Sequence, residues 1–269
     1  MSAISNVFQK LKAQGSGALI GYVMAGDPAP EHLPRIADAL IKGGIDLLEL
    51  GIPFSDPIAD GPTIQAASVR ALKAGTTPKK VLEMAKIIKR QHKVPIAVMT
   101  YYNPVFKMGL DEFFALSRSS GVDGVIVPDL PIEEADDLRK AATDSGIDTI
   151  FLAAPSTTNQ RLTKIVQATS GFLYLVSHFG VTGAKSAVAD STISLVKRVQ
   201  PLIAGRVPLA VGFGISKSEH VKSILAAGAD GVIVGSAFVN IIATNQDNLG
   251  KITNELEKTA QNLKQATRK

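Results

Sequence analysis

Three carboxylates stand close together in one short run of the sequence, residues 47–62. Glu49 lies inside an apolar stretch, and Asp56 and Asp60 follow in a loop that contains three prolines. An acid at the end of a strand, with another on the loop that follows, can place two proton-handling groups around one small substrate. The run therefore predicts general acid–base chemistry.

Each of the two acids that we favour has an alternative interpretation. Leu47 and Glu49 share one face of the predicted strand, and an apolar setting there raises the pKa of Glu49 and suits it to donate a proton near neutral pH. The alternative for Glu49 is a buried acid held by a structural partner, because an isolated ionised carboxylate is costly to bury. For Asp60 the alternative is the N-cap of a helix that starts near Pro62.

Two glycine-rich turns predict a phosphate site. Residues 212–216 read Gly-Phe-Gly-Ile-Ser after one apolar run, and Gly235-Ser236 follow the next run and open an apolar helical segment. Glycine lets the backbone approach an anion, and the free N–H groups of a helix start face it. Ordinary turn chemistry is the alternative.

A long loop and a set of aromatic side chains complete the predicted site. Residues 177–190 are rich in small residues and predict a loop that closes over the site, with a flexible surface loop as the alternative. Four aromatic residues lie near predicted strand ends: Tyr22, Tyr101, Tyr174 and Phe213. Together with the phosphate site they favour a substrate with one flat apolar end and one phosphate end.

The elements that position these site residues follow from the sequence, in which short apolar runs alternate with amphipathic stretches. Most of the runs are continuously apolar, as expected of parallel strands covered by helices. Eight strands are predicted, at residues 18–23, 46–50, 95–100, 124–127, 149–153, 172–176, 208–211 and 231–234. A Gly-x-Asp sequence at 44–46, 121–123, 146–148 and 228–230 precedes or opens a strand, where glycine ends a helix and aspartate fits the turn.

Eight such units in 269 residues predict an α/β fold, a (β/α)8 TIM barrel, as a single domain over residues 1–269. Helical spacing over residues 4–11 predicts an extra N-terminal helix across the barrel floor. An open doubly wound sheet is the alternative, but no Gly-x-Gly-x-x-Gly follows the first predicted strand. In a barrel the reacting groups gather at the C-terminal ends of the strands, which favours a functional role for Glu49.

Composition narrows the function further. The chain has no cysteine, which excludes disulfides and thiol chemistry, and its four histidines are too far apart to predict a metal site. The net charge is +5, but the lysines are spread along predicted helices, so we expect no nucleic-acid partner. No apolar stretch has the length of a signal peptide or a membrane span, so we expect a soluble cytoplasmic protein with no membrane partner.

Taken together, the motifs resemble the tryptophan synthase alpha subunit family over nearly the whole chain. The resemblance rests on residues 26–28, 48–62, 100–104, 127–131, 180–184, 212–215 and 235–236. It implies a lyase of L-tryptophan biosynthesis that cleaves indole-3-glycerol phosphate to indole and glyceraldehyde 3-phosphate by a retro-aldol reaction. It also implies no cofactor in this chain, and a pyridoxal-phosphate-bearing beta subunit as its partner in an alpha2-beta2 complex.

The resemblance assigns a role to each matching residue. Glu49 matches the acid–base residue that protonates indole C3 and helps to remove the glycerol hydroxyl proton, and Asp60 matches the carboxylate at the indole N–H. Thr182 matches a loop residue that hydrogen-bonds Asp60. The positions around the indole match Tyr22, Tyr101, Ile126, Leu152, Tyr174 and Phe213. The phosphate site matches Gly183, Gly214, Gly235 and Ser236, and the beta-subunit contacts match Pro53, Asp56 and Asn103.

Three other functions share parts of this pattern. A standalone indole-3-glycerol phosphate lyase would carry the same acids without needing a beta subunit. A non-catalytic regulatory barrel would only bind its partner, but both acids are present here. A phosphosugar isomerase would share the phosphate turns, which recur widely among barrels.

Overall fold

The computed structural model describes residues 1–176, 185–212 and 214–268, with only the backbone of 185–190. Within these residues lies one sheet in which every neighbouring pair of strands is parallel. Its strands are β1 Ala18–Met24, β2 Leu47–Gly51, β3 Ile96–Met99, β4 Gly124–Ile126, β5 Asp148–Ile150, β6 Leu152–Ala153, β7 Leu173–Val176, β8 Leu209–Gly212 and β9 Gly231–Val234. Their order in the sheet is β5-β4-β3-β2-β1-β9-β8-β7-β6.

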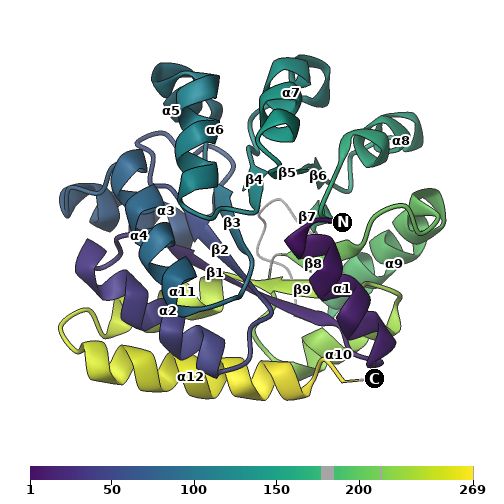
Figure 1. Ribbon diagram of the computed structural model, residues 1–269. Helices are drawn as coiled ribbons and strands as arrows, with labels where there is room; N and C mark the ends of the chain where they lie inside the picture. Colours follow the sequence, from purple (N-terminus) through teal and green to yellow (C-terminus); the bar gives the residue numbers. More distant parts are fainter. Residues whose placement is uncertain (177–184, 213, 269) are drawn as a thin grey trace.

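The two ends of the sheet meet at an interruption in the fifth predicted strand, and this closes the barrel. Residues 149–153 were predicted as one strand, but β5 and β6 are separated at Phe151, so that prediction of continuity is wrong. β5 pairs only with β4, and β6 pairs only with β7, so the two ends of the sheet meet within six residues of chain, 148–153 (Figure 1). Strands in a closed barrel are staggered, so the β4–β5 pairing and the β6–β7 pairing involve different residues of this short segment. The other predicted strands and the TIM-barrel fold are confirmed.

The helices pack around the outside of the sheet, except α1, which lies across one end of the barrel (Figure 1). They are α1 Ala3–Ala13, α2 Leu33–Lys42, α3 Pro62–Lys73, α4 Pro78–Gln91, α5 Tyr102–Met108, α6 Leu110–Ser119, α7 Asp136–Asp144, α8 Asn159–Ala168, α9 Lys185–Ile203, α10 Ser218–Ala226, α11 Ser236–Thr244 and α12 Leu249–Gln265, with 3-10 turns η1 Pro30–His32 and η2 Ile132–Glu134. Because α9 begins at Lys185, residues 185–190 of the loop predicted at 177–190 are helical, and residues 177–184 lie outside the described residues. None of the helices in the described ranges has the length and apolar character to span a bilayer.

The barrel interior is filled by alternate residues of the strands. A cluster of buried side chains there includes Ile20, Leu47 and Ile233. Ile4, Phe8 and Leu11 of α1 belong to the same cluster, and the rings of Phe8 and Phe172 lie 5.7 Å apart. The predicted N-terminal helix is thus confirmed, and its apolar face closes the end of the barrel opposite to the C-terminal ends of the strands.

Three aspartates of the Gly-x-Asp turns fasten neighbouring strands together. The Oδ2 atom of Asp46 accepts a hydrogen bond from the Leu19 amide at 2.8 Å, and Asp123 accepts one from the Ile96 amide at 2.8 Å. Asp230 accepts one from the Leu209 amide at 2.9 Å. Each acceptor therefore reaches back to the start of the preceding strand, which the turn-based prediction did not foresee.

Candidate active site

A cavity of about 580 Å³ opens at the C-terminal ends of the strands. Strands β1, β2, β3, β6, β7 and β9 contribute to its wall, and so do the loops that follow β2, β4, β6, β8 and β9. Eight of the residues predicted from the sequence lie in this wall: Tyr22, Glu49, Asp60, Leu152, Tyr174, Gly214, Gly235 and Ser236. The fold therefore brings together acids, aromatic rings and glycine turns that are far apart in the sequence.

Glu49 faces the interior from the middle of β2, and it is only 1% exposed. Neither of its carboxylate oxygens has a hydrogen-bond partner among the described residues. Burial, and next the charge of Asp60, raise the pKa of Glu49 to about 8. Within the described part of the chain no structural partner holds this acid, and the interpretation as a functional group gains support.

Asp60 is held by the hydroxyl of Tyr101 rather than by a helix start. The Tyr101 hydroxyl donates to Asp60 Oδ2 at 3.1 Å and accepts from the Ala59 amide at 3.0 Å. The N-cap of α3 is Gly61, without a side-chain cap bond, so the N-cap alternative for Asp60 is wrong. Burial raises the pKa of Asp60 to about 6, and the hydrogen bond from Tyr101 opposes that rise.

Tyr22 of β1 and Tyr174 of β7 line the same cavity as the two acids. Burial raises the pKa of both phenols, and the negative charges of Glu49 and Asp60 add to the rise, so both hydroxyls stay protonated. The Tyr22 hydroxyl is buried without a hydrogen-bond partner among the described residues. At Gly212 a Cβ atom would approach the Tyr174 ring to 2.5 Å, so glycine makes room for that ring.

The predicted phosphate turns follow β8 and β9, and Gly214, Gly235 and Ser236 line the same cavity as Asp60. Gly235 is the N-cap of α11, and Ser236 is its first residue. A Cβ atom at Gly235 would come within 3.3 Å of the Tyr22 ring, so the helix start packs closely against β1. Gly214 has a φ of 74°, which favours glycine. The free N–H groups at the start of α11 can therefore face an anion in the cavity.

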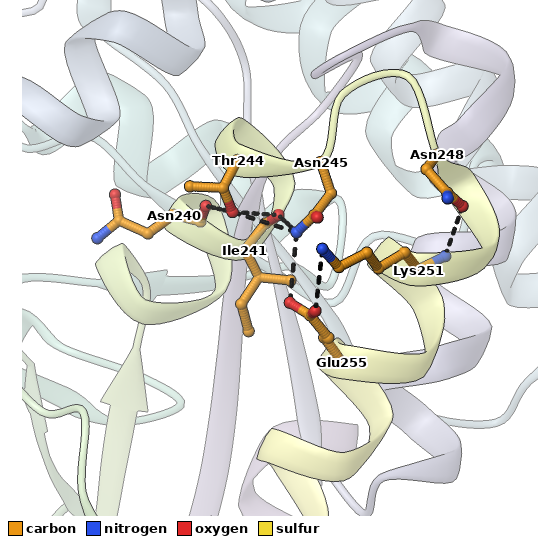
Figure 2. A network of polar contacts seen from close by, with 7 residues as sticks. All are labelled: Asn240, Ile241, Thr244, Asn245, Asn248, Lys251 and Glu255. Carbon is orange, nitrogen blue, oxygen red and sulfur yellow. Dashed lines mark hydrogen bonds and ion pairs between the residues drawn. The ribbon is translucent and has the colours of Figure 1, made fainter.

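A polar network fastens the other end of α11 to α12, as Figure 2 shows. The Asn245 side-chain amide donates to the Ile241 carbonyl at 2.9 Å and to Glu255 of α12 at 3.3 Å. The Lys251 ammonium lies 3.9 Å from the same carboxylate. Asn248 caps α12 by accepting from the Lys251 amide at 2.9 Å. These contacts fix the position of the helix whose first turn meets the cavity.

The remaining predicted residues have three different locations. Tyr101 and Ile126 are buried next to the cavity but do not form its wall, Tyr101 behind Asp60 and Ile126 in the interior cluster. Thr182, Gly183 and Phe213 lie outside the described residues. Of the predicted partner contacts, Pro53 is buried, whereas Asp56 and Asn103 are exposed beside the cavity mouth. Two large apolar side chains are exposed in the same segments, Ile58 at 83% and Phe106 at 70%.

Sequence reasoning did not single out four polar residues of the wall: Asp129, Thr157, Arg161 and Asn240. Asp129 lies in the motif at 127–131, which was a usable signal. Arg161 lies in the first turn of α8, away from any strand end, so the strand-end rule does not find it. Within the described residues, no three His, Asp or Glu side chains are arranged to hold a metal ion.

Known proteins resemble this chain over its full length. The sequence model described as "Tryptophan synthase alpha chain" matches residues 8–268. The tryptophan synthase alpha chain of Methanosarcina mazei is 50% identical over 261 residues, which cover 97% of this chain and 93% of the relative. The alpha chain of Methanocaldococcus jannaschii is 47% identical, covering 94% and 89%.

Solved structures agree with the sequence comparison. A structure of the tryptophan synthase a2b2 complex from Pyrococcus furiosus contains a chain with a TM-score of 0.87 and 43% identity, covering 93% of this chain and 98% of that one. A Mycobacterium tuberculosis tryptophan synthase structure gives a TM-score of 0.89 at 36% identity, with 100% and 99% coverage. On the fold, the cavity and these relatives together, the chain belongs to the tryptophan synthase alpha chain family.

Proposed function

We propose that Glu49 and Asp60 are the catalytic pair with which this alpha chain, a lyase, cleaves indole-3-glycerol phosphate to indole and glyceraldehyde 3-phosphate. One observation carries the assignment: a buried and a half-buried carboxyl group in the same cavity have pKa values of about 8 and about 6. Environments that separate two such pKa values assign one group as acid and the other as base or charge stabiliser. At neutral pH Glu49 is then protonated and Asp60 is largely ionised.

The first step is proton transfer to the indole ring. Glu49 gives its proton to indole C3, which becomes tetrahedral, and positive charge develops at the ring nitrogen. The ionised Asp60 accepts the indole N–H hydrogen bond and stabilises that charge at short range in a partly desolvated site. The Tyr101 hydroxyl holds the Asp60 carboxylate in place for this contact.

The second step breaks the carbon–carbon bond. The Glu49 carboxylate takes the proton of the glycerol hydroxyl next to C3, and the oxygen electrons form the aldehyde carbonyl. The electron pair of the broken bond returns to the indole ring and cancels the positive charge. Glu49 ends the cycle protonated again, so this chain works by proton transfer alone, and we assign pyridoxal phosphate only to the beta subunit.

The other assigned residues bind the substrate. The indole lies among Tyr22, Leu152 and Tyr174, with Tyr101 and Ile126 supporting the wall. The phosphate lies at Gly214, Gly235 and Ser236, where the start of α11 offers N–H groups. Thr182, Gly183 and Phe213, outside the described residues, keep the roles that the family resemblance gives them.

The partner is the beta subunit, in an alpha2-beta2 complex. Pro53, Asp56 and Asn103 lie in segments beside the cavity mouth, and the exposed side chains of Ile58 and Phe106 lie in those same segments. Exposed large apolar groups beside polar ones are typical of a protein interface. We further propose that residues 1–269 form one domain, because the sheet closes only when both halves of the chain contribute strands. We also propose that the protein is cytoplasmic, as expected from the sequence, and that it has no nucleic-acid partner, because its lysines are spread along helices such as α4.

Indole release from indole-3-glycerol phosphate tests the proposal, measured with and without a beta subunit. E49Q and D60N should each lower kcat by about 100-fold or more, since a missing general acid or charge stabiliser costs that much. D136N on the exposed part of α7 is the matched control and should keep full activity. Fast wild-type turnover without the partner would instead indicate a standalone lyase, and no turnover in either condition would indicate a regulatory barrel.

A further inference from the structure

The charges in the cavity wall oppose entry of the substrate phosphate. Three carboxyl groups line the wall: those of Asp60 and Asp129, and that of Glu49, which is protonated at neutral pH. Arg161 is the one cationic side chain that the described residues contribute to it. A phosphate monoester carries between one and two negative charges near neutral pH. The substrate thus meets a largely negative surface, and a single guanidinium offsets it.

Arg161 lies at the rim of the cavity, on α8, which follows β6. Its guanidinium Nη2 donates to Glu133 Oε2 of η2 at 2.9 Å, so the ion pair joins the loops after β4 and β6. The side chains of Arg161 and Glu133 are 48% and 50% exposed. An ion pair at such exposure contributes little stability, so the guanidinium can exchange its partner for another anion at small cost.

Arg161 and the start of α11 belong to different parts of the rim. In the sheet order, β7 and β8 separate β6 from β9, the strand that precedes α11. Arg161 is therefore positioned to meet an anion that enters the cavity, and α11 is positioned to hold it afterwards. The planar guanidinium also matches a phosphate in geometry, because it can donate two parallel hydrogen bonds.

We propose that Arg161 captures the phosphate of the incoming substrate at the cavity rim, and that Glu133 competes with the phosphate for it. The proposal rests on the proposed function, which supplies the phosphate-bearing substrate. It gives Arg161 a role in the association rate rather than in the chemical step. The capture role can be told apart from a purely structural role of the ion pair. Loss of either Arg161 or Glu133 breaks the ion pair, but only loss of Arg161 removes the cation.

The absence of tryptophan from the chain makes the association rate directly measurable. The probe is 3-(indol-3-yl)propyl phosphate, which cannot be cleaved because it lacks the hydroxyl that becomes the aldehyde. We would follow its indole fluorescence in a stopped-flow instrument as it binds the full chain. R161Q should lower the association rate constant about three- to tenfold at low salt and flatten its dependence on ionic strength. E133Q should raise the rate constant, and R161K should keep most of it.

Two comparisons decide the outcome. R139Q removes a cation from an exposed pair with Asp136 outside the cavity wall, and it should leave the association rate unchanged. Equal slowing by R161Q and E133Q, an unchanged rate in R161Q, or equal slowing by R139Q would each overturn the capture role. The kcat/KM for indole release should fall in R161Q in proportion to the association rate constant, and it should stay at the wild-type value in R139Q. A wild-type chain that binds the probe but releases no indole would count against the proposed function instead.

Discussion

Glu49 combines deep burial with the absence of any hydrogen-bond partner among the described residues. That combination raises its pKa to about 8, while Asp60, with a donor from Tyr101, titrates at about 6. The pH profile of kcat/KM should therefore be bell-shaped, with its maximum between about pH 6 and 8. Steady-state rates from pH 5 to 10 test this expectation.

The same profile has an internal control. The negative charge of Asp60 contributes to the raised pKa of Glu49, so this pKa should be lower in D60N. The residual activity of D60N should therefore decline at a lower alkaline pH than the activity of the wild type. A rate that stays constant from pH 6 to 10 in the wild-type chain would contradict the assignment of Glu49 as the acid.

Tyr101 is a positioning residue for Asp60. Its hydroxyl donates to the carboxylate and lowers the Asp60 pKa, so Y101F should move the acidic limb of the kcat/KM profile to higher pH. Y102F is the matched control, because the adjacent tyrosine makes its contact to Asp129 through the backbone amide. If Y101F and Y102F give the same profile, the positioning role is wrong.

At the scale of the elements, the aspartates that join neighbouring strands should stabilise the barrel. D123A removes the acceptor of the Ile96 amide and the partner of Lys89. It should lower the free energy of unfolding by about 1–3 kcal/mol, because a buried amide loses its acceptor. Urea denaturation measures the change.

The smaller substitution D123N retains a side-chain oxygen and should cost less stability than D123A. D144A changes an exposed aspartate at the end of α7 and should leave the unfolding midpoint nearly unchanged. A loss in D144A as large as that in D123A would show that the effect is one of charge rather than of the strand-to-strand bond.

The elements were predictable where a local pattern decides them. Continuous apolar runs marked most of the strands but not the break at Phe151, and helical spacing at Ile4, Phe8 and Leu11 marked α1. Contacts that join distant segments were not predictable. From the sequence, Asp60 fitted the N-cap of a helix as well as it fitted a functional acid. Only its contact with Tyr101, 41 residues away in the sequence, decides between the two. Arg161 enters the cavity wall because the barrel brings α8 to its rim.

For the whole molecule, the buried acid should make stability depend on pH. The pKa of Glu49 is raised from 4.5 to about 8 on folding, so the folded state binds more protons than the unfolded state between those values. The free energy of unfolding should therefore fall as pH rises through this range, by up to roughly 5 kcal/mol in total. E49Q should lack this fall, and urea denaturation at pH 5, 7 and 9 measures it.

Asp60 contributes a fall of the same sign at lower pH in both proteins, so the comparison isolates Glu49. E133Q, which changes an exposed carboxylate, should keep the wild-type slope. Parallel curves for wild type and E49Q would mean that Glu49 is not buried as an unpartnered acid in solution.

The break at Phe151 divides the chain as well as the sheet. Residues 1–150 contain β1 to β5 as sequential neighbours, and residues 152–268 contain β6 to β9 in the same way. Two fragments cut at this residue would each keep a continuous sheet, and the β1–β9 ladder would have to form between them. Glu49 and Asp60 come from one fragment and the start of α11 from the other, so activity that returns on mixing would report complementation by two half-barrels.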